Sequence, residues 1–245
     1  MGEVKKAVTN RNFWIGAVIL TIAFFVSGQP YMETILRTGY SVEGIGWIEV
    51  FRYCTENEKG QLFVPLCAPF AAGIFAEAEL KSRYALFACS RIGRKKYYIK
   101  KIAEAALPGG MMVCVSQFFL LGASYARFHE ITSYAETTDR RAMFLFLLAG
   151  LFRGLLNGFF WALLGSFFAV MTKSVYMAYS VPFVFYYILT VFQQRYYREL
   201  YFLSPKHWAV PDHYSNVFCM FMLTILLIFV GIGFLVSVRR RLGYE

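Results

Sequence analysis

Three polar residues spaced four apart in an apolar stretch are the first candidates for chemistry in this 245-residue sequence. Arg153, Asn157 and Trp161 would share one face of a helix, because an α-helix repeats about every 3.6 residues. An arginine is costly in lipid, so this face should turn toward protein or toward a water-filled cavity. We predict that the three residues line a passage through the molecule. A buried set of purely structural hydrogen bonds is the alternative.

The groups that a membrane enzyme would need are not arranged for catalysis. All three histidines (His129, His207 and His213) fall between the apolar stretches, and neither HExxH nor GxSxG occurs. The five cysteines show no CxxC spacing, which argues against a zinc site or a disulfide framework. A GxxxxGK[ST] phosphate-binding loop is also absent. We therefore predict no catalytic residue, no metal and no cofactor in this chain.

The composition indicates that helices embedded in a membrane position these residues. The chain is 58% hydrophobic and 16% charged, whereas soluble domains are about a quarter charged. Its apolar residues gather in blocks of roughly the 20 residues that cross a bilayer. We predict an all-α polytopic membrane protein with six transmembrane helices, at Asn12–Gly28, Leu62–Ala78, Pro108–Ala126, Gly154–Met171, Ser174–Phe192 and Asn216–Val238.

The distribution of basic residues predicts the orientation of these helices. With both termini in the cytoplasm, 15 of the 25 Lys and Arg residues lie in inner segments and nine in outer ones, with Arg153 at a boundary. Because cytoplasmic loops carry an excess of Lys and Arg, we place both termini on the cytoplasmic side of a cell membrane. The net charge of +10 then faces anionic headgroups, so a nucleic-acid partner is not expected.

Segments outside the crossings receive their own predictions. Residues 1–11 are compatible with an interfacial helix, and residues 127–153 and 193–215 should be extracytoplasmic. The 30 residues from Ala142 to Met171 exceed one straight crossing, so either this helix tilts and protrudes outward or Ala142–Phe152 forms a separate helix. We expect the separate helix, with Arg153 at the junction, because an arginine near the bilayer centre is costly. The fourth crossing also carries small residues every four positions, which favour close helix packing within one subunit or between subunits: Gly150, Gly154, Gly158, Ala162 and Ser166.

The segment 77–101 is predicted to face the cytoplasm. Leu80, Tyr84 and Phe87 form an apolar stripe at helical spacing, and Gly93 should end that helix before a basic restart at Arg94. Such a helix would lie along the membrane surface, where it can rest on lipid or press against a cytoplasmic partner.

This segment resembles ABC transporter permeases of the type-2 export class. The resemblance is carried by Pro69-Phe70-Ala71-Ala72, Glu77, Glu79-Leu80-Lys81-Ser82-Arg83, Cys89-Ser90-Arg91-Ile92-Gly93-Arg94-Lys95-Lys96-Tyr97 and Lys101. Pro182-Phe183 and Leu203-Ser204-Pro205-Lys206-His207-Trp208 resemble the lantibiotic-immunity-like subgroup of small permeases. The pattern extends over essentially the whole chain, although Arg83-Tyr84 stands where that family often has a small residue.

The resemblance implies a permease that works with a separate ATPase. ATP and Mg²⁺ would bind in that partner, and a second permease copy or a sister permease would complete the pathway within membrane lipids. The residues expected to couple to the ATPase are Glu77, Glu79, Lys81, Arg83, Tyr84, Phe87, Arg91 and Arg94.

The function expected on this basis is that of a single permease domain, residues 1–245, in a bacterial ATP-driven exporter. Its aromatic-rich crossings, together with the resemblance to the lantibiotic-immunity-like subgroup, favour an amphipathic substrate such as an antimicrobial peptide, a lipid or a drug. A non-catalytic assembly or sensor-associated membrane subunit is the alternative, and a membrane-embedded enzyme is a third class.

Overall fold

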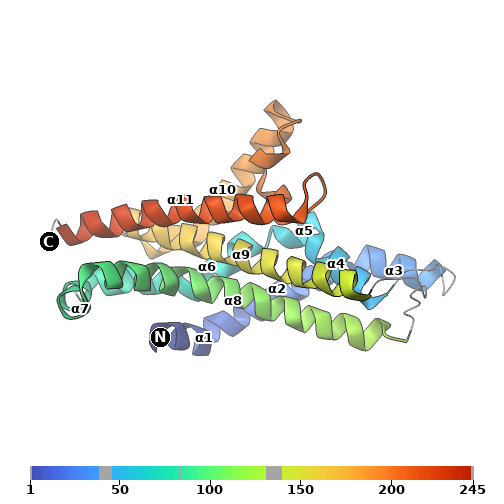
Figure 1. The fold of residues 1–245 in the computed structure, drawn as a ribbon, viewed down its shortest axis with the longest axis horizontal. Coiled ribbons are helices and arrows are strands. Elements are labelled where there is room, and N and C mark those ends of the chain that lie inside the picture. Colours follow the sequence, from blue (N-terminus) through green and yellow to red (C-terminus); the bar gives the residue numbers. More distant parts are fainter. Residues whose placement is uncertain (1, 39–45, 83, 131–139, 244–245) are drawn as a thin grey trace.

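The computed structural model describes residues 2–38, 46–82, 84–130 and 140–243, and no strand occurs in these segments (Figure 1). The first half contains α1 (Gly2–Thr9), α2 (Arg11–Ser27), α3 (Gln29–Thr38), α4 (Trp47–Glu56), α5 (Glu58–Gln61), α6 (Val64–Lys81) and α7 (Tyr84–Ile92). The second half contains α8 (Arg94–Phe128), α9 (Arg140–Thr172), α10 (Val175–Tyr196), the 3₁₀ turns η2 (Tyr201–Leu203) and η3 (Pro205–His207), and α11 (Asn216–Gly243). The predicted all-α class is confirmed.

Four of these helices are long and apolar enough to cross a membrane: α8, α9, α10 and α11. Helices α2 and α3 meet at a bend of 44° and together could make a fifth crossing. Helix α6 coincides with the predicted second crossing, but it ends in Glu77, Glu79 and Lys81, and those charges set it apart from the four. The predicted apolar segments are thus helices, while a count of six crossings stays a prediction.

The long helices run side by side, and their ends define two ends of the molecule (Figure 1). Helix α1, helix α7 and the last turns of α11 lie toward the left of Figure 1, at what we call the basic end. Helices α3 and α4 lie at the opposite end, called the far end. The predicted N-terminal helix is therefore present as α1, and both described chain ends lie toward the same end of the molecule.

The prediction of a separate helix at Ala142–Phe152 is wrong. Helix α9 continues through Arg153 without a break for 33 residues. A break was expected in order to keep the Arg153 charge out of lipid, but this side chain is buried against protein and paired with Glu56. Because protein supplies the counter-charge, the helix can pass straight through this position.

Helix α9 is the central element, since it contacts α6, α8, α10, α11 and α4. Its small residues face α8 closely: a Cβ at Gly158 would lie 2.7 Å from the carbonyl oxygen of Gly109, and one at Gly154 would strike the Gln117 side chain. Gly154 and Gly158 thus lie at a close contact between two helices of the same chain, and a role of the stripe between subunits stays a prediction. Helix α10, in contrast, leans out of the bundle (Figure 1), and the buried residues on it are Ala178, Pro182, Tyr186 and Gln193.

Candidate functional site

The short helix α7 lies at the basic end, between the end of α6 and the start of α8 (Figure 1). Helix α6 stops at Lys81 and α7 begins at Tyr84, so Leu80 and Phe87 do not belong to one helix. Leu80 is 5% exposed, whereas Phe87 is 63% exposed. The predicted single stripe is wrong because α7 turns its small residues, Ala85 and Ala88, toward the bundle.

Glu77 fastens the end of α6 to the end of α11. Its carboxylate forms an ion pair with Arg241 and lies 3.4 Å from the second guanidinium nitrogen. Glu77 is buried, and Arg241 also donates to the carbonyl oxygen of Val170 on α9, at 3.4 Å. The pair therefore joins three helices where they meet at the basic end.

Glu79 fastens the same end of α6 to α8. It forms an ion pair with Lys101 and accepts a hydrogen bond of 3.1 Å from the Tyr97 hydroxyl. Lys101 lies 2.9 Å from Glu104, one turn along α8, and both residues are buried. A buried ammonium between two carboxylates is compensated, which is the condition for keeping such charges out of water.

The residues predicted for coupling thus divide into two groups. Glu77 and Glu79 point into the molecule and hold its helices, whereas Lys81, Phe87, Arg91 and Arg94 are exposed at the basic end. Arg83 and the Tyr84 side chain lie outside the described part of the structure. Contact with an ATPase stays a prediction for both groups.

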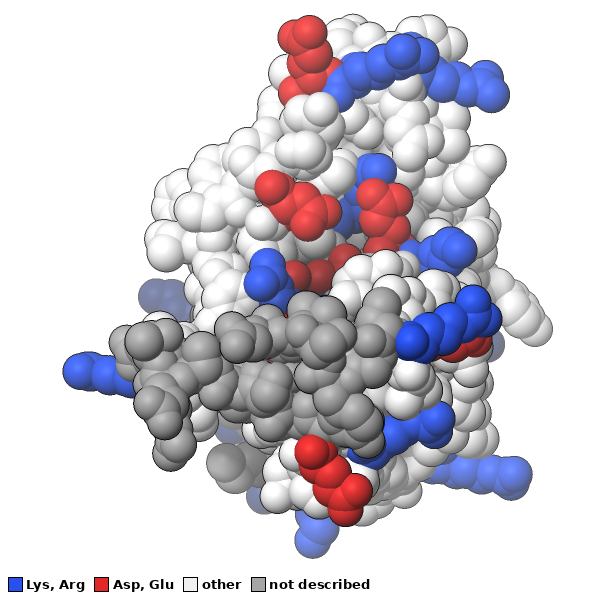
Figure 2. All heavy atoms as spheres, turned by 90° about the vertical axis from the view of Figure 1, so that its right-hand side faces the viewer, with Lys and Arg blue, Asp and Glu red and all other residues white. Residues whose placement is uncertain are grey.

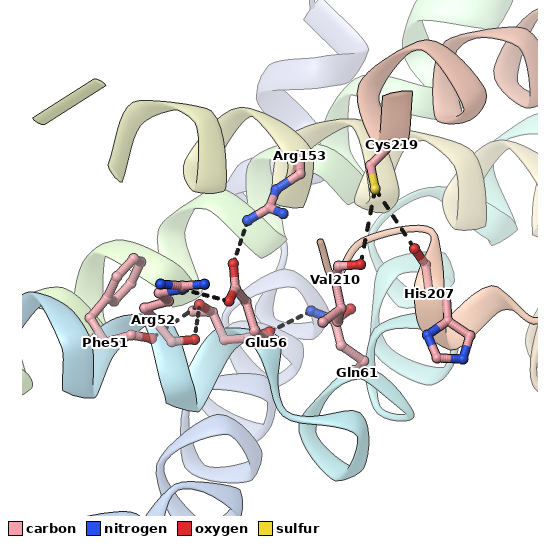
Figure 3. Close-up of polar contacts among 9 residues, drawn as sticks. Phe51, Arg52, Glu56, Gln61, Arg153, His207, Val210 and Cys219 are labelled. Carbon is pink, nitrogen blue, oxygen red and sulfur yellow. Dashed lines mark hydrogen bonds and ion pairs between the residues drawn. The ribbon is translucent and has the colours of Figure 1, made fainter. Parts of the chain in front are cut away.

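The polar residues of α9 form side-chain hydrogen bonds with α4 and α5, and Figure 3 shows the contact between Arg153 and Glu56. Arg153 donates to Glu56 at 2.6 Å, Asn157 donates to Gln61 at 3.0 Å, and the Trp161 indole donates to Asn157 at 2.9 Å. All three α9 side chains are at most 4% exposed. We call this set the polar row. It corresponds to the structural alternative considered above, and a role in lining a passage stays a prediction.

Glu56 and Gln61 of the polar row also form hydrogen bonds with residues of α4. The second carboxylate oxygen of Glu56 accepts a bond of 2.9 Å from Arg52, and Gln61 donates to the carbonyl oxygen of Thr55 at 2.6 Å (Figure 3). Glu56 therefore lies between two guanidinium groups, one exposed and one buried.

A polar cavity of about 570 Å³ opens beside this carboxylate. Its lining includes four acids and two bases: Glu49, Glu56, Glu58, Asp212, Arg52 and Lys59. Figure 2 looks onto the far end, where acidic and basic side chains surround a hollow in the surface. Burial, together with the nearby charge of Glu56, raises the pKa of Asp212. The cavity is thus acidic on balance and open to one side of the molecule.

The segment after α10 packs against α9 through aromatic contacts. Trp208 stacks on Trp161 with ring centroids 6.2 Å apart, and its indole donates to the carbonyl oxygen of Phe202 at 2.7 Å. The backbone of His207 accepts a weak contact from the Cys219 thiol at 3.8 Å (Figure 3). Burial of the His207 ring, with Lys206 and His213 nearby, lowers its pKa to about 4.

No family model, no curated protein and no solved structure matches this chain. Within the described segments, no three His, Cys, Asp or Glu side chains come together in a way that could hold a metal ion.

The sequence signals one of the ion pairs in these sites but not the others. Lys101 and Glu104 stand three apart on a helix, a spacing that signals an ion pair. Arg241, however, lies 164 positions from Glu77, and Glu56 lies 97 positions from Arg153, so nothing local connects them.

Proposed function

We propose that this chain is the membrane-spanning permease subunit of an ATP-driven exporter of the ABC type, with the ATPase on a separate chain. The proposal rests first on the resemblance of the segment from α6 to α8 to type-2 export permeases. The structural observation that supports it best is α7, a short helix at the end of the bundle that carries an exposed aromatic residue and exposed basic residues.

In this proposal α7 receives force from the ATPase and passes it to the bundle. Phe87 would enter a groove of the partner, while Arg91 would set its register through an opposite charge. Glu77 and Glu79 then transmit the push, because their ion pairs tie the end of α6 to α11 and α8.

The proposed orientation places the basic end in the cytoplasm and the far end outside, with six crossings that include α6. The excess of Lys and Arg in the inner segments supports it, since that excess determines the orientation of most membrane proteins. The exposed apolar faces of α10 and α11 would meet lipid, a second copy or a sister permease. An amphipathic peptide, lipid or drug is the proposed cargo.

Co-purification with a co-expressed ATPase encoded by a neighbouring gene tests this function. A buried aromatic anchor is worth about 2 kcal/mol at such an interface, so Phe87→Asp should weaken the complex by about 30-fold. The matched control is Phe202→Asp, which alters another exposed phenylalanine in the segment after α10. Equal retention of the ATPase by both variants would rule out the contact at α7.

A non-catalytic assembly or sensor-associated subunit is the second candidate. It predicts that no ATPase is bound and that ATP causes no substrate movement in vesicles. Labelling with a membrane-impermeant maleimide tests the orientation: in a variant whose five native cysteines are replaced by serine, a cysteine introduced at Ser90 should react only after the cells are opened. Reaction at that position in intact cells would place α7 outside and remove the exporter proposal.

A further inference from the structure

A second cavity of about 570 Å³ lies at the basic end, apart from the buried ion pairs. Cys89 and Ser90 of α7, Arg94 and Tyr98 of α8, and the end of α11 line it. From α11 come Arg239, Leu242 and Gly243. Three helices that are distant in sequence thus form one basic pocket, which we call the Arg94–Arg239 pocket.

The two arginines of this pocket lack acidic partners. The nearby carboxylates of Glu77, Glu79 and Glu104 pair with Arg241, Lys101 and Lys100 instead. Within the described part of the chain, no carboxylate lies within ion-pairing distance of Arg94 or Arg239. Both side chains are exposed, so the pocket holds two uncompensated positive charges.

The chemistry of the pocket suits a phosphate group. Two guanidinium groups offer paired N–H donors that match the oxygens of a phosphate. Tyr98 adds a phenol hydroxyl that makes no hydrogen bond within the described chain. The first turn of α8 carries Arg94, Lys95 and Lys96 and no acid, so an anion here would also relieve repulsion among these bases.

The exposed apolar face of α11 favours a lipid over a free phosphate as the ligand of the pocket. Phe229, Ile232 and Val236 of α11 are 76%, 57% and 46% exposed. Their spacing of three and four residues places them on one face, and Arg239 follows three residues after Val236 on that face. Ten residues of helix from Phe229 to Arg239 span about 15 Å, half of the hydrocarbon thickness of about 30 Å. An acyl chain can therefore lie along this face while its headgroup enters the pocket.

We propose that the Arg94–Arg239 pocket binds the headgroup phosphate of an anionic phospholipid whose acyl chain packs on the exposed face of α11. Basic pockets between membrane helices commonly recognise such headgroups. The proposal needs neither an ATPase nor transport, so it can stand or fall separately from the exporter function.

Native mass spectrometry of the purified full-length protein, titrated with short-chain phosphatidylglycerol or phosphatidylcholine, tests the proposal. We expect tighter binding of phosphatidylglycerol, and a loss of about tenfold or more in Arg94→Gln/Arg239→Gln. The matched control, Lys5→Gln/Lys6→Gln, removes two exposed charges of α1 at the same end and should retain most of the affinity.

Two further measurements separate the lipid from its headgroup alone. Val236→Asn should weaken phosphatidylglycerol binding, and soluble glycerol phosphate at an equal concentration should not displace the lipid. The proposal is overturned if both double variants lose affinity equally, if phosphatidylcholine binds as tightly, or if glycerol phosphate competes on equal terms. Arg94→Lys/Arg239→Lys, which keeps the charge, should recover part of the binding and so excludes a general folding defect.

Discussion

Replacing Gly158 by alanine tests the close approach of α9 to α8. The new Cβ would lie 2.7 Å from the carbonyl oxygen of Gly109 and 2.8 Å from the Cα of Gly110. These separations are about 0.7 Å shorter than an ordinary contact of ~3.5 Å. Both neighbours are backbone atoms, so no side chain can rotate away and the helices must separate.

The expected cost follows from two opposing effects. Overpacking in a close-packed interior costs about 1–3 kcal/mol, whereas alanine in place of glycine in a helix gains about 1 kcal/mol. Gly122→Ala on α8 supplies the matched control, because a Cβ there would meet nothing within 4 Å. The control therefore reports the gain alone, and Gly158→Ala should be less stable than the control by about 1–3 kcal/mol.

Thermal unfolding in detergent, followed by circular dichroism, measures this difference. For a chain of this size each kcal/mol corresponds to roughly 2–4 °C in the midpoint, so Gly158→Ala should unfold several degrees below Gly122→Ala. Identical midpoints in the two variants would refute the backbone contact between α8 and α9.

Three further perturbations address the charged groups. Arg153→Met should destabilise the fold by about 3 kcal/mol because Glu56 loses its buried partner. In denaturant titrations, the double variant with Glu56→Gln should recover part of this loss, and additive losses would contradict the pairing. Glu77→Gln should leave Arg241 uncompensated and speed proteolysis between α6 and α7, so an unchanged cleavage rate would argue against the tie to α11. Burial lowers the pKa of His207 from 6.5 to about 4. The unfolded chain therefore binds this proton at a higher pH than the folded chain does, and the free energy of unfolding should decrease as the pH is lowered from 6.5 to 4. His207→Asn should flatten that part of the profile of unfolding midpoint against pH, and an identical slope in both proteins would exclude this histidine as its source.

The sequence predicts the helical regions of this fold well, because long apolar blocks admit few other structures in lipid. The restart of the chain at Gly93 is confirmed, with φ +87° and α8 beginning at Arg94. Helix α4 was not anticipated, although Trp47, Val50 and Cys54 repeat at helical spacing and the latter two are buried. Charged residues between these positions, Glu49 and Arg52, obscure the apolar spacing in the sequence.

Pairings across the chain limit what the sequence can predict about the sites. The positions of Arg153, Asn157 and Trp161 on one face follow from helical spacing, but their partners on α4 and α5 depend on tertiary packing. In the same way, Glu77 and Glu79 could be recognised as unusual carboxylates at the end of an apolar helix. Their inward direction is decided by Arg241 and Lys101, which reach them from other helices.

Helix α9 is held on two of its faces, by the ion pair of Arg153 with Glu56 and by close packing against α8. These contacts limit which helices can move when the protein changes shape. Turning α9 about its axis would strand the Arg153 charge on one side and drive side chains against the α8 backbone on the other. Helices α8 and α9 should therefore move together as one rigid unit. Helix α10 has only four buried residues among those the structure describes, so its tilt would disturb less of the packed interior than a movement of α9. A change of shape would therefore move α10 relative to α8 and α9, and a cross-link between α10 and α9 should prevent that movement.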